Sequence, residues 1–427
     1  MQQQRVEKIK LKLSKEDYNL IYNACVNANN LYNHANYIVR QKFIETSKLK
    51  EQGKIKNAIW LRYEELDKIL KNDKEYPDYY RLPLVKNSQQ ILRLVDKNWK
   101  SFFESIKDWK KNPNKYKGRP KLPKYREKQK PFMLITVSQN GFHIKNNELV
   151  FTKALNNIRV KITCNQRKDF IDIQQARFRV VNKNIELEII YKVEVRDEKV
   201  DNKRYCSIDL GVDNLLAITN NVGEQPILVN GKGLKSINQY YNKKLVELKS
   251  VLKKCQNKYW SNQLQRLTRK RNNKIDYELH KISKWLVNYC KENNINTIVI
   301  GQNKGWKQES EMSKKNNQNF IQIPFTDLIQ KITYKAQEQG IKVIMQEESY
   351  TSKASFINND DIPIYKEDDN TKCKFSGYRQ YRGWYKIKNS KQGINADING
   401  SYNIMKKALG VEYNKGLKIT PKKIKVA

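Results

Sequence analysis

Acidic residues are scarce in this sequence. The 427-residue chain has 44 Asp and Glu against 84 Lys and Arg, which gives a formal net charge of +40. A surface this basic repels itself unless anions screen it, and nucleic acid binds such a surface by exchanging its counterions for Lys and Arg. Attachment to a membrane surface is the competing interpretation, but the sequence has no apolar run long enough to span a bilayer. The composition therefore favours a nucleic-acid partner.

Cysteine and histidine are also few. No two of the six cysteines lie within three residues of each other, which argues against a zinc ribbon built from Cys-x-x-Cys pairs. None of the three histidines has a second one at metal-ligand spacing. The first twenty residues lack the apolar core of a signal peptide, so we expect a cytoplasmic protein whose scattered cysteines are small core residues.

Hydrophobic periodicity divides the N-terminal half into helical and β segments. Residues 5–12 alternate apolar and charged side chains, and residues 14–110 show the three- and four-residue spacing of amphipathic helices. The apolar stripe around Trp99 is interpreted as a core face rather than as a base-stacking surface. Residues 131–196 alternate again between turn signals, which predicts a small antiparallel sheet or barrel that the strand at 5–12 joins.

The sharpest change in composition falls at residues 107–130. This stretch has eleven Lys or Arg, two acids and three prolines, with tyrosines between the basic residues. A solvated linker and a segment that grips a nucleic-acid backbone are both consistent with it, because prolines stiffen the chain and tyrosines offer stacking faces. The candidate nucleic-acid-binding residues here are Lys117, Arg119, Lys121 and Lys124.

The second half predicts an α/β domain. Three strands form a meander within 203–230, and a long helical region follows within 234–293, where a basic stretch adds Arg269 and Arg271 to the candidate nucleic-acid-binding residues. Strand, helix, strand and a last helix then alternate, which is the order of an RNase H-like domain. These later elements are expected at 297–300, near 324–339, at 341–346 and from 397.

Two aspartates in this domain are candidate metal ligands. Asp209 follows the apolar residues "YCSI", where a charge is costly unless it is paired with a base or binds a cation. Asp397 stands at the start of the last helix, where an N-cap is the simpler role, with Asn399 close by to assist it. Phosphodiester cleavage by two Mg²⁺ ions needs a cluster of such acids, because Mg²⁺ takes oxygen ligands.

Five motifs, in chain order, carry a family resemblance. They are "SIDLGVDNLLAIT", "TIVIGQNKGWKQ", "NNQNFIQIPF", "EESYTSKASF" and "INADINGSYNI". Together with the basic segment after the helical region, they resemble the TnpB family of transposon-encoded RNA-guided nucleases, prokaryotic relatives of compact type V CRISPR effectors. The resemblance implies a guide RNA from the transposon end and a double-stranded DNA target beside a short flanking motif.

The same resemblance implies an α+β chain of several domains. They are a helical recognition lobe, a small antiparallel β wedge domain and a RuvC-like nuclease domain of RNase H fold. The expected boundaries are 1–13 for the first wedge strand, 14–110 for the recognition lobe, 111–200 for the basic linker and wedge, and 201–427 for the nuclease domain, with an inserted nucleic-acid-loading segment at 349–392.

The sequence departs from the family pattern in two places. Most members have a catalytic Glu at the position of Gly301, and they have a four-cysteine zinc module after the segment that matches residues 351–353. Here Ser355 replaces the first of those cysteines and Cys373 is the sole cysteine in the region, so we expect no zinc. The absent Glu indicates either an inactive enzyme or a relocated acid.

Relocation is the favoured interpretation. Glu347 and Glu348 follow the strand expected beside 297–300, and neighbouring strands lie about 4.8 Å apart, a distance that a glutamate side chain spans. Side chains alternate along a strand, so one of the two should point inward, and Glu348 is chosen because it resembles a subgroup that reads "ESYTS". Glu309 and Glu311 are third-choice acids.

The sequence is thus interpreted as an RNA-guided DNA endonuclease of a transposable element. Cleavage by two Mg²⁺ ions would use Asp209, Glu348 and Asp397. Arg379 and Arg382 are candidate contacts to the scissile backbone, or else part of a solvated basic loop. A nuclease-inactive RNA-guided repressor and a guide-independent RNase H-like resolvase are the alternatives.

Overall fold

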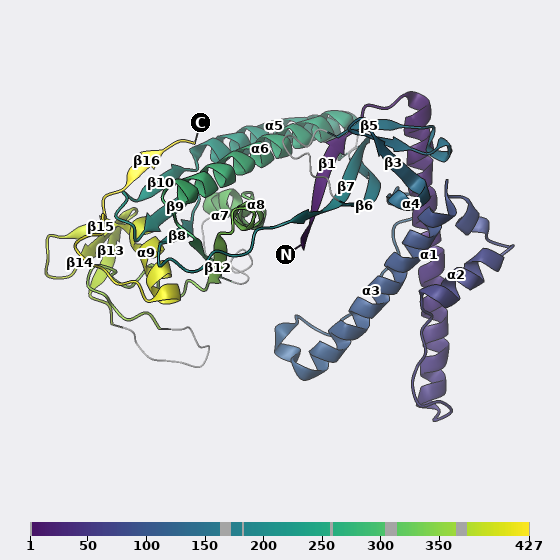
Figure 1. Ribbon diagram of the computed structural model, residues 1–427, viewed down its shortest axis with the longest axis horizontal. Helices are drawn as coiled ribbons and strands as arrows, with labels where there is room; N and C mark the ends of the chain where they lie inside the picture. Colours follow the sequence, from purple (N-terminus) through teal and green to yellow (C-terminus); the bar gives the residue numbers. More distant parts are fainter. Residues whose placement is uncertain are drawn as a thin grey trace. The chain divides into compact units, whose positions relative to one another are not determined.

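The computed structural model describes residues 2–162, 172–181, 183–256, 259–303, 314–363 and 374–426. Within those ranges the chain forms two compact units, Gln2–Glu194 and Val195–Ala427 (Figure 1). None of the helices described there has both the length and the apolar character that crossing a membrane requires.

Long helices form one layer of the N-terminal unit. Trp99, on α3 (Val85–Lys111), is fully buried and donates its Nε1–H to Asn36 Oδ1 of α1 (Lys15–Glu51) at 2.9 Å. The interpretation of the Trp99 stripe as a core face is therefore confirmed. The other helices of this layer are α2 (Tyr63–Asn72), η1 (Pro77–Tyr80) and η2 (Pro113–Lys115).

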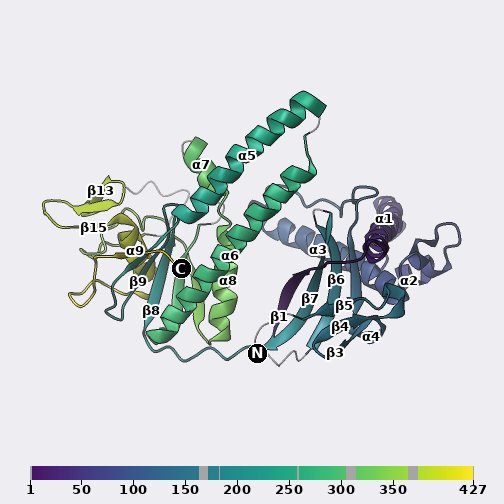
Figure 2. The same ribbon diagram turned by 90° about the horizontal axis from the view of Figure 1, so that it is seen from above.

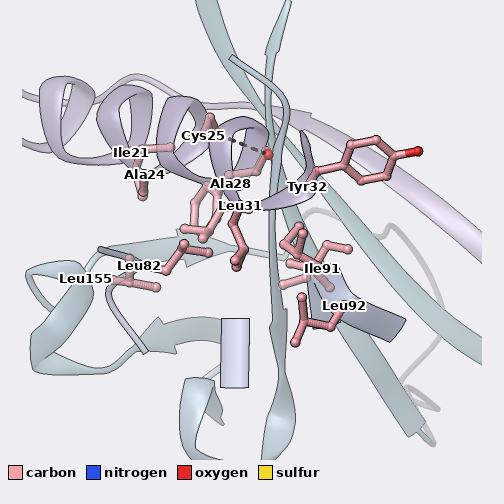
Figure 3. Close-up of a cluster of buried hydrophobic side chains, with 14 of the residues drawn as sticks. Ile21, Ala24, Cys25, Ala28, Leu31, Tyr32, Leu82, Ile91, Leu92 and Leu155 are labelled. Carbon is pink, nitrogen blue, oxygen red and sulfur yellow. Dashed lines mark hydrogen bonds between the residues drawn. The ribbon is translucent and has the colours of Figure 1, made fainter. Parts of the chain in front are cut away.

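A four-stranded antiparallel sheet packs against these helices. Its order is β1-β7-β6-β2, so the N-terminal strand pairs with β7 across the helical insertion, as predicted. Figure 3 shows the apolar face of α1, with Ile21 and Leu31, in the buried cluster, where the Cys25 thiol donates to the Phe178 carbonyl of β6 at 3.6 Å. These strands are β1 (Gln2–Lys10), β2 (Met133–Val137), β6 (Asp172–Val181) and β7 (Asn184–Glu194). A smaller sheet contains β3 (Phe142–Lys145), β4 (Glu148–Phe151) and β5 (Arg159–Lys161), with the short helices α4 (Ser138–Gly141) and η3 (Lys153–Leu155).

A six-stranded mixed sheet organises the C-terminal unit. Its order is β12-β11-β8-β9-β10-β16; the predicted meander is formed by β8, β9 and β10, and β11 and β12 continue the sheet in parallel beyond β8. The RNase H-like order and the predicted pairing of the strand at 341–346 with that at 297–300 are confirmed. The strands are β8 (Tyr205–Leu210), β9 (Asn214–Asn220), β10 (Ile227–Asn230), β11 (Thr297–Gly301), β12 (Lys342–Gln346) and β16 (Lys422–Ile424).

Helices cover both faces of this sheet (Figure 2). On one face lie α6 and α8, and on the other lies α9, which leads out of a three-stranded sheet, β13-β14-β15. The helices are α5 (Lys232–Gln256), α6 (Asn262–Glu292), α7 (Lys314–Ile321), α8 (Phe325–Glu338) and α9 (Ala396–Leu409), and the small sheet contains β13 (Gly377–Tyr381), β14 (Trp384–Ile387) and β15 (Gly393–Asn395).

Alternation along β8 decides which side chains meet which helices. Cys206 and Ile208 belong to the apolar core with α6 and α8. Ser207 faces α9 instead: its Oγ donates to the Ser401 carbonyl at 2.7 Å, and Ser401 Oγ donates to the Ser207 carbonyl at 3.0 Å. Asp209 has the same parity as Ser207, so the fold directs its carboxylate toward α9.

Candidate active site

Asp209 lies beneath a helix residue that has no side chain. A Cβ atom added at Gly400 of α9 would lie 2.8 Å from Asp209 Oδ2. Any larger residue at 400 would therefore displace either the carboxylate or the helix. The neighbouring Ser207–Ser401 hydrogen bonds keep α9 at this close distance.

Glu348 occupies the space above Gly301. A Cβ atom added at Gly301 would lie 2.2 Å from Glu348 Oε1 and 2.5 Å from Ile404 Cδ1 of α9. Gly301 pairs with Gln346 where the parallel strands β11 and β12 end, and the chain turns toward β11 two residues later. The glycine and the glutamate are therefore complementary: the position without a side chain accommodates the carboxylate from the next strand.

The loop after β12 holds Glu348 by its backbone. The Glu348 amide donates to Asn303 Oδ1 at 2.9 Å, and its carbonyl accepts from the Thr351 amide at 3.1 Å and from Thr351 Oγ1 at 2.8 Å. These bonds fix the direction of the side chain without using its carboxylate.

Glu347 has a different environment from its neighbour. Its carboxylate accepts from the largely buried Lys407 ammonium at 2.5 Å and from the Ser349 amide at 2.6 Å. The loop therefore directs Glu347 to a structural ion pair and Glu348 to the space beside Asp209.

Charge is left uncompensated around Glu348 and Asp209. Burial raises the pKa of Asp209 well above its ordinary value, the carboxylates of Glu348 and Asp397 raise it further, and Arg379 offsets part of the effect. Burial, followed by the charge of Glu347, raises the pKa of Glu348 to about 7. Glu348 Oε1 is buried and has no hydrogen-bond partner among the described residues.

Asp397 does not cap α9. The N-cap is Asn395, whose Oδ1 accepts from the Asp397 amide at 3.1 Å and from the Ile398 amide at 3.2 Å. The Asp397 carboxylate instead accepts from Asn214 Nδ2 at 2.7 Å and lies 3.5 Å from Arg379 Nη2. Asp397 is three positions before Gly400 on α9, so it lies on the face of the helix that meets Asp209.

The prediction that Asn399 assists Asp397 is wrong. The Asn399 side chain is fully buried and accepts from the Phe356 amide at 3.0 Å while it donates to the Ala354 carbonyl at 2.7 Å. It holds the segment after β12 on α9, and its side chain is directed at that segment rather than at Asp397.

The carboxylate oxygens are suitable ligands for a hard divalent cation, but they are not oriented here as a complete metal site. In the described ranges no three His, Cys, Asp or Glu side chains stand close enough to hold a metal ion as they are oriented here. The unpartnered Glu348 oxygen and the mutual repulsion that raises the Asp209 pKa are nevertheless what a bound cation would relieve. All of the donors are oxygens, which Mg²⁺ prefers.

Two predicted arginines lie at the edge of this site. Arg379 is on β13, beside Asp397, and its guanidinium is about half exposed. Arg382 pairs with Asp213, in the turn between β8 and β9, and Lys235 binds the other oxygen of Asp213 at 2.5 Å. The hairpin formed by β13 and β14 thus brings both arginines next to the ends of β8 and α9.

The other predicted basic residues differ in their exposure. Arg271 is held inside the C-terminal unit, because its guanidinium donates to Asn238 Oδ1 at 2.8 Å and to the Gln322 carbonyl at 2.7 Å, and burial lowers its pKa. These bonds give Arg271 a structural role, and its predicted contact with nucleic acid stays a prediction. Arg269, two residues before it, is half-buried on α6. Lys117, Arg119, Lys121 and Lys124 are exposed in the segment after α3.

A second polar cluster, around the carboxylate of Asp360, lies in the region where the family resemblance would place a zinc module. Asp360 Oδ2 accepts from the amides of Ser355 and Ser376 at 2.8 and 3.0 Å, and its Oδ1 accepts from Ser376 Oγ at 2.7 Å. Nothing in the sequence pattern singled out Asp360, because its partners are 5 and 16 residues away in loops. Cys373, Glu309 and Glu311 lie outside the described residues.

Sequence comparison finds similarity to a family described as a probable transposase. Residues 188–307 match the OrfB_IS605 family, described as a probable transposase, and residues 325–404 match the Cas12f1-like TNB domain. The TnpB-like protein ORF457 of Acidianus two-tailed virus is 24% identical, over 90% of this chain and 82% of that protein.

Structural comparison gives the same fold. The structure of a Cas12f1–sgRNA–target DNA complex is similar with a TM-score of 0.57 at 15% identity, and the match covers 95% of this chain and 84% of that one. The expected fold class, a multidomain α+β chain like the compact type V effectors, is therefore confirmed.

Proposed function

We propose that the chain is a member of the TnpB family and acts as an RNA-guided DNA endonuclease of a transposable element. Its structural relative is a Cas12f1 protein with sgRNA and target DNA, and the +40 charge of this chain supports ligands of the same kind. In this mode, base pairing with the guide reads the target sequence, while the protein recognises duplex shape and a short flanking motif. Its partners would be a guide RNA from the transposon end and a double-stranded DNA target.

The observation that supports nuclease activity is the Glu348 carboxylate in the space above Gly301. A buried oxygen without a partner, next to two further carboxylates, destabilises a fold that has no cation to neutralise it. Such arrangements are typical of functional sites. A relocated catalytic glutamate accounts for both the absent side chain at 301 and the uncompensated charge at 348.

The roles of the residues follow from their positions. Asp209, Glu348 and Asp397 would hold two Mg²⁺ ions, with Asn214 fixing one oxygen of Asp397. When bound, such ions activate a water molecule and stabilise the leaving oxygen of a phosphodiester. Arg379, whose guanidinium is half exposed, offers hydrogen bonds to a phosphate of the strand to be cut.

The basic residues would hold the nucleic acid away from the acids. In the N-terminal unit these are Lys117, Arg119, Lys121 and Lys124, and in the C-terminal unit they are the exposed Arg382 and the half-buried Arg269.

Plasmid cleavage tests the proposal. The protein is purified with its RNA, the RNA is sequenced, and the substrate carries the matching target beside a randomised flank, with and without Mg²⁺. Glu348→Gln preserves the shape of the side chain and removes its charge, and Glu198→Gln, at an exposed position, is the matched control. We expect a loss of at least about 100-fold for Glu348→Gln and none for the control, since even second-shell changes at metal sites cost about 10–100-fold.

Two outcomes would contradict this assignment in different ways. Equal cleavage by the parent and Glu348→Gln would remove Glu348 from the site. Guide-dependent binding of the target by the parent, without cleavage in Mg²⁺, would replace the nuclease by an RNA-guided repressor.

A further inference from the structure

An extended basic segment of the N-terminal unit is fastened along α1. Four side chains of α1 hydrogen-bond to the backbone of residues 119–128, which we call the strap. They come from positions four, three and four residues apart, so they lie along one face of the helix. These residues are Asn29, Asn33, Asn36 and Arg40.

The bonds go to the strap backbone. Asn36 Nδ2 and Arg40 Nη2 donate to the Pro123 carbonyl at 3.2 and 2.7 Å, and Asn29 Nδ2 donates to the Glu127 carbonyl at 2.8 Å. Together they span the middle of the strap. The charged side chains of the strap are not used in these bonds.

Asn33 makes the most specific of these contacts. Its Nδ2 donates to the Arg126 carbonyl at 3.0 Å, and its Oδ1 accepts from the Arg126 amide at 2.8 Å. A carboxamide thus pairs with one residue as a neighbouring β-strand would. Asp would lack the donor, and Ala would lack both groups.

Apolar contacts fix the strap on its inner side. Leu122 packs against the core of the N-terminal unit, Arg126 stacks on Phe132 at 3.6 Å, and Arg40 covers Tyr125 at 4.6 Å. The Tyr125 ring is thereby covered on one face, which leaves it less suited to stacking on bases.

The lysines of the strap are left on the outside. Lys121 and Lys124 are exposed, and within the described ranges neither forms an ion pair with an acid. Leu122 and Pro123, which lie between these two lysines, are half-buried.

We propose that the strap is a pre-organised binding surface for the sugar-phosphate backbone of nucleic acid, and that the four α1 side chains are its positioning residues. A free linker of this composition would lose conformational entropy on binding, whereas this segment is ordered by the fold itself. The contacts are charge to phosphate, so binding is independent of sequence. The identity of the nucleic acid rests on the proposed function, but the surface does not depend on cleavage.

Binding measured against salt concentration separates contact from positioning. Full-length protein is freed of nucleic acid in high salt, and the probes are fluorescein-labelled 25-base-pair random-sequence duplexes of DNA and of RNA, without Mg²⁺. For Lys121→Ala and Lys124→Ala we expect the slope of log K against log salt to fall by about 0.7–0.9 each, because one phosphate contact is lost. For Asn33→Ala we expect binding about 3–10-fold weaker at every salt concentration with the slope unchanged.

The matched control is Asn27→Ala. Asn27 also lies on α1, but its Nδ2 donates to the Arg81 carbonyl, outside the strap, so its loss should leave both affinity and slope unchanged. Hydrogen exchange provides a second measurement: the Arg126 amide should exchange at least about 10-fold faster in Asn33→Ala, while the amides of α1 keep their protection.

The outcomes distinguish the possibilities. Unchanged salt slopes in both lysine variants would overturn the strap as a phosphate-binding surface. Faster exchange at Arg126 with unchanged affinity would overturn the positioning role. A salt slope that changes with only one of the two duplexes supports the proposal and identifies the bound nucleic acid as RNA or DNA. Neither the salt slopes nor the amide exchange depends on cleavage, so a parent protein that does not cleave DNA would leave both measurements unaffected.

Discussion

Two polar clusters of the C-terminal unit, one around Asp360 and one around Glu348, differ in how their charge is compensated. Asp360 accepts three hydrogen bonds from Ser355 and Ser376, all within 3.0 Å. Glu348, near Asp209, has one buried carboxylate oxygen that is unpartnered among the described residues. The first cluster is complete as it stands and joins two loops, whereas the second has an excess of negative charge. A buried acid that the fold satisfies is structural, and one that it leaves unsatisfied marks the place where a ligand is missing.

The largest expected effect is the loss of cleavage rate on substitution of Gly301. We expect Gly301→Ala to slow Mg²⁺-dependent cleavage by about 100-fold, since its Cβ would displace Glu348 from Asp209 and small misplacements of catalytic groups cost this much. The single-turnover rate on a guide-matched plasmid measures it. The double variant Gly301→Glu with Glu348→Gly should recover part of the rate, because it supplies the acid from the neighbouring strand. A Gly301→Ala rate equal to that of the parent would show that the space above Gly301 is irrelevant to catalysis.

The next effect concerns the complete cluster. Asp360→Ala removes the acceptor of three hydrogen bonds and leaves two amides unsatisfied, so we expect a loss of about 2–3 kcal/mol in unfolding free energy. Urea denaturation of the parent and the variant measures the difference. Asp361→Ala, at the exposed adjacent position, is the control and should stay within about 0.5 kcal/mol of the parent. Equal losses in the two variants would remove the contrast between the clusters.

Removing the charge of Glu348 should raise the unfolding free energy at high pH, whereas removing Asp360 should lower it. The pKa of Glu348 is raised to about 7 in the folded state, so unfolding free energy should fall as the pH rises from about 4.5 to about 7, because the folded chain must then ionise a buried acid. In metal-free buffer at pH 8 we therefore expect Glu348→Gln to be more stable than the parent, by on the order of 1 kcal/mol. Denaturation at pH 5 and pH 8 tests this. A variant that is less stable at pH 8 would mean that Glu348 is satisfied in the fold.

The smallest effect is expected from zinc removal. Asp360 joins the loops around Ser355 and Ser376 by hydrogen bonds, and we expect no zinc there, so a zinc-selective chelator should leave the thermal midpoint unchanged. Differential scanning fluorimetry with and without the chelator measures this. A lowered midpoint that added zinc restores would contradict it.

The sequence predicted the parts of the site that depend on strand order. Pairing of the strand after residue 340 with that at 297–300 follows from periodicity, and from it the proximity of Glu348 to Gly301 follows. The choice between Glu347 and Glu348 depends on Lys407, a residue 60 positions away, and no local pattern contains that contact.

The contacts of two further residues were not visible in the sequence for related reasons. Asn399 is two positions after Asp397, which on a helix turns its side chain to another face. Arg271 reads as a basic surface residue in sequence, but its partners Asn238 and Gln322 lie 33 and 51 positions away. The strap was predicted as basic, and its attachment to α1 over 83 to 98 positions was not accessible to any sequence window.

The close approach of Glu348 to Gly301 also constrains how such a chain evolves. Glutamates at 301 and 348 compete for one volume, so a protein with both would hold neither in its proper position. A lineage that changes one arrangement for the other by single substitutions must pass through a form with no glutamate or with two displaced ones. Either intermediate has low fitness if cleavage is selected, so the two arrangements are separate adaptive peaks, joined by a valley that a transposon crosses most readily while its nuclease is not under selection.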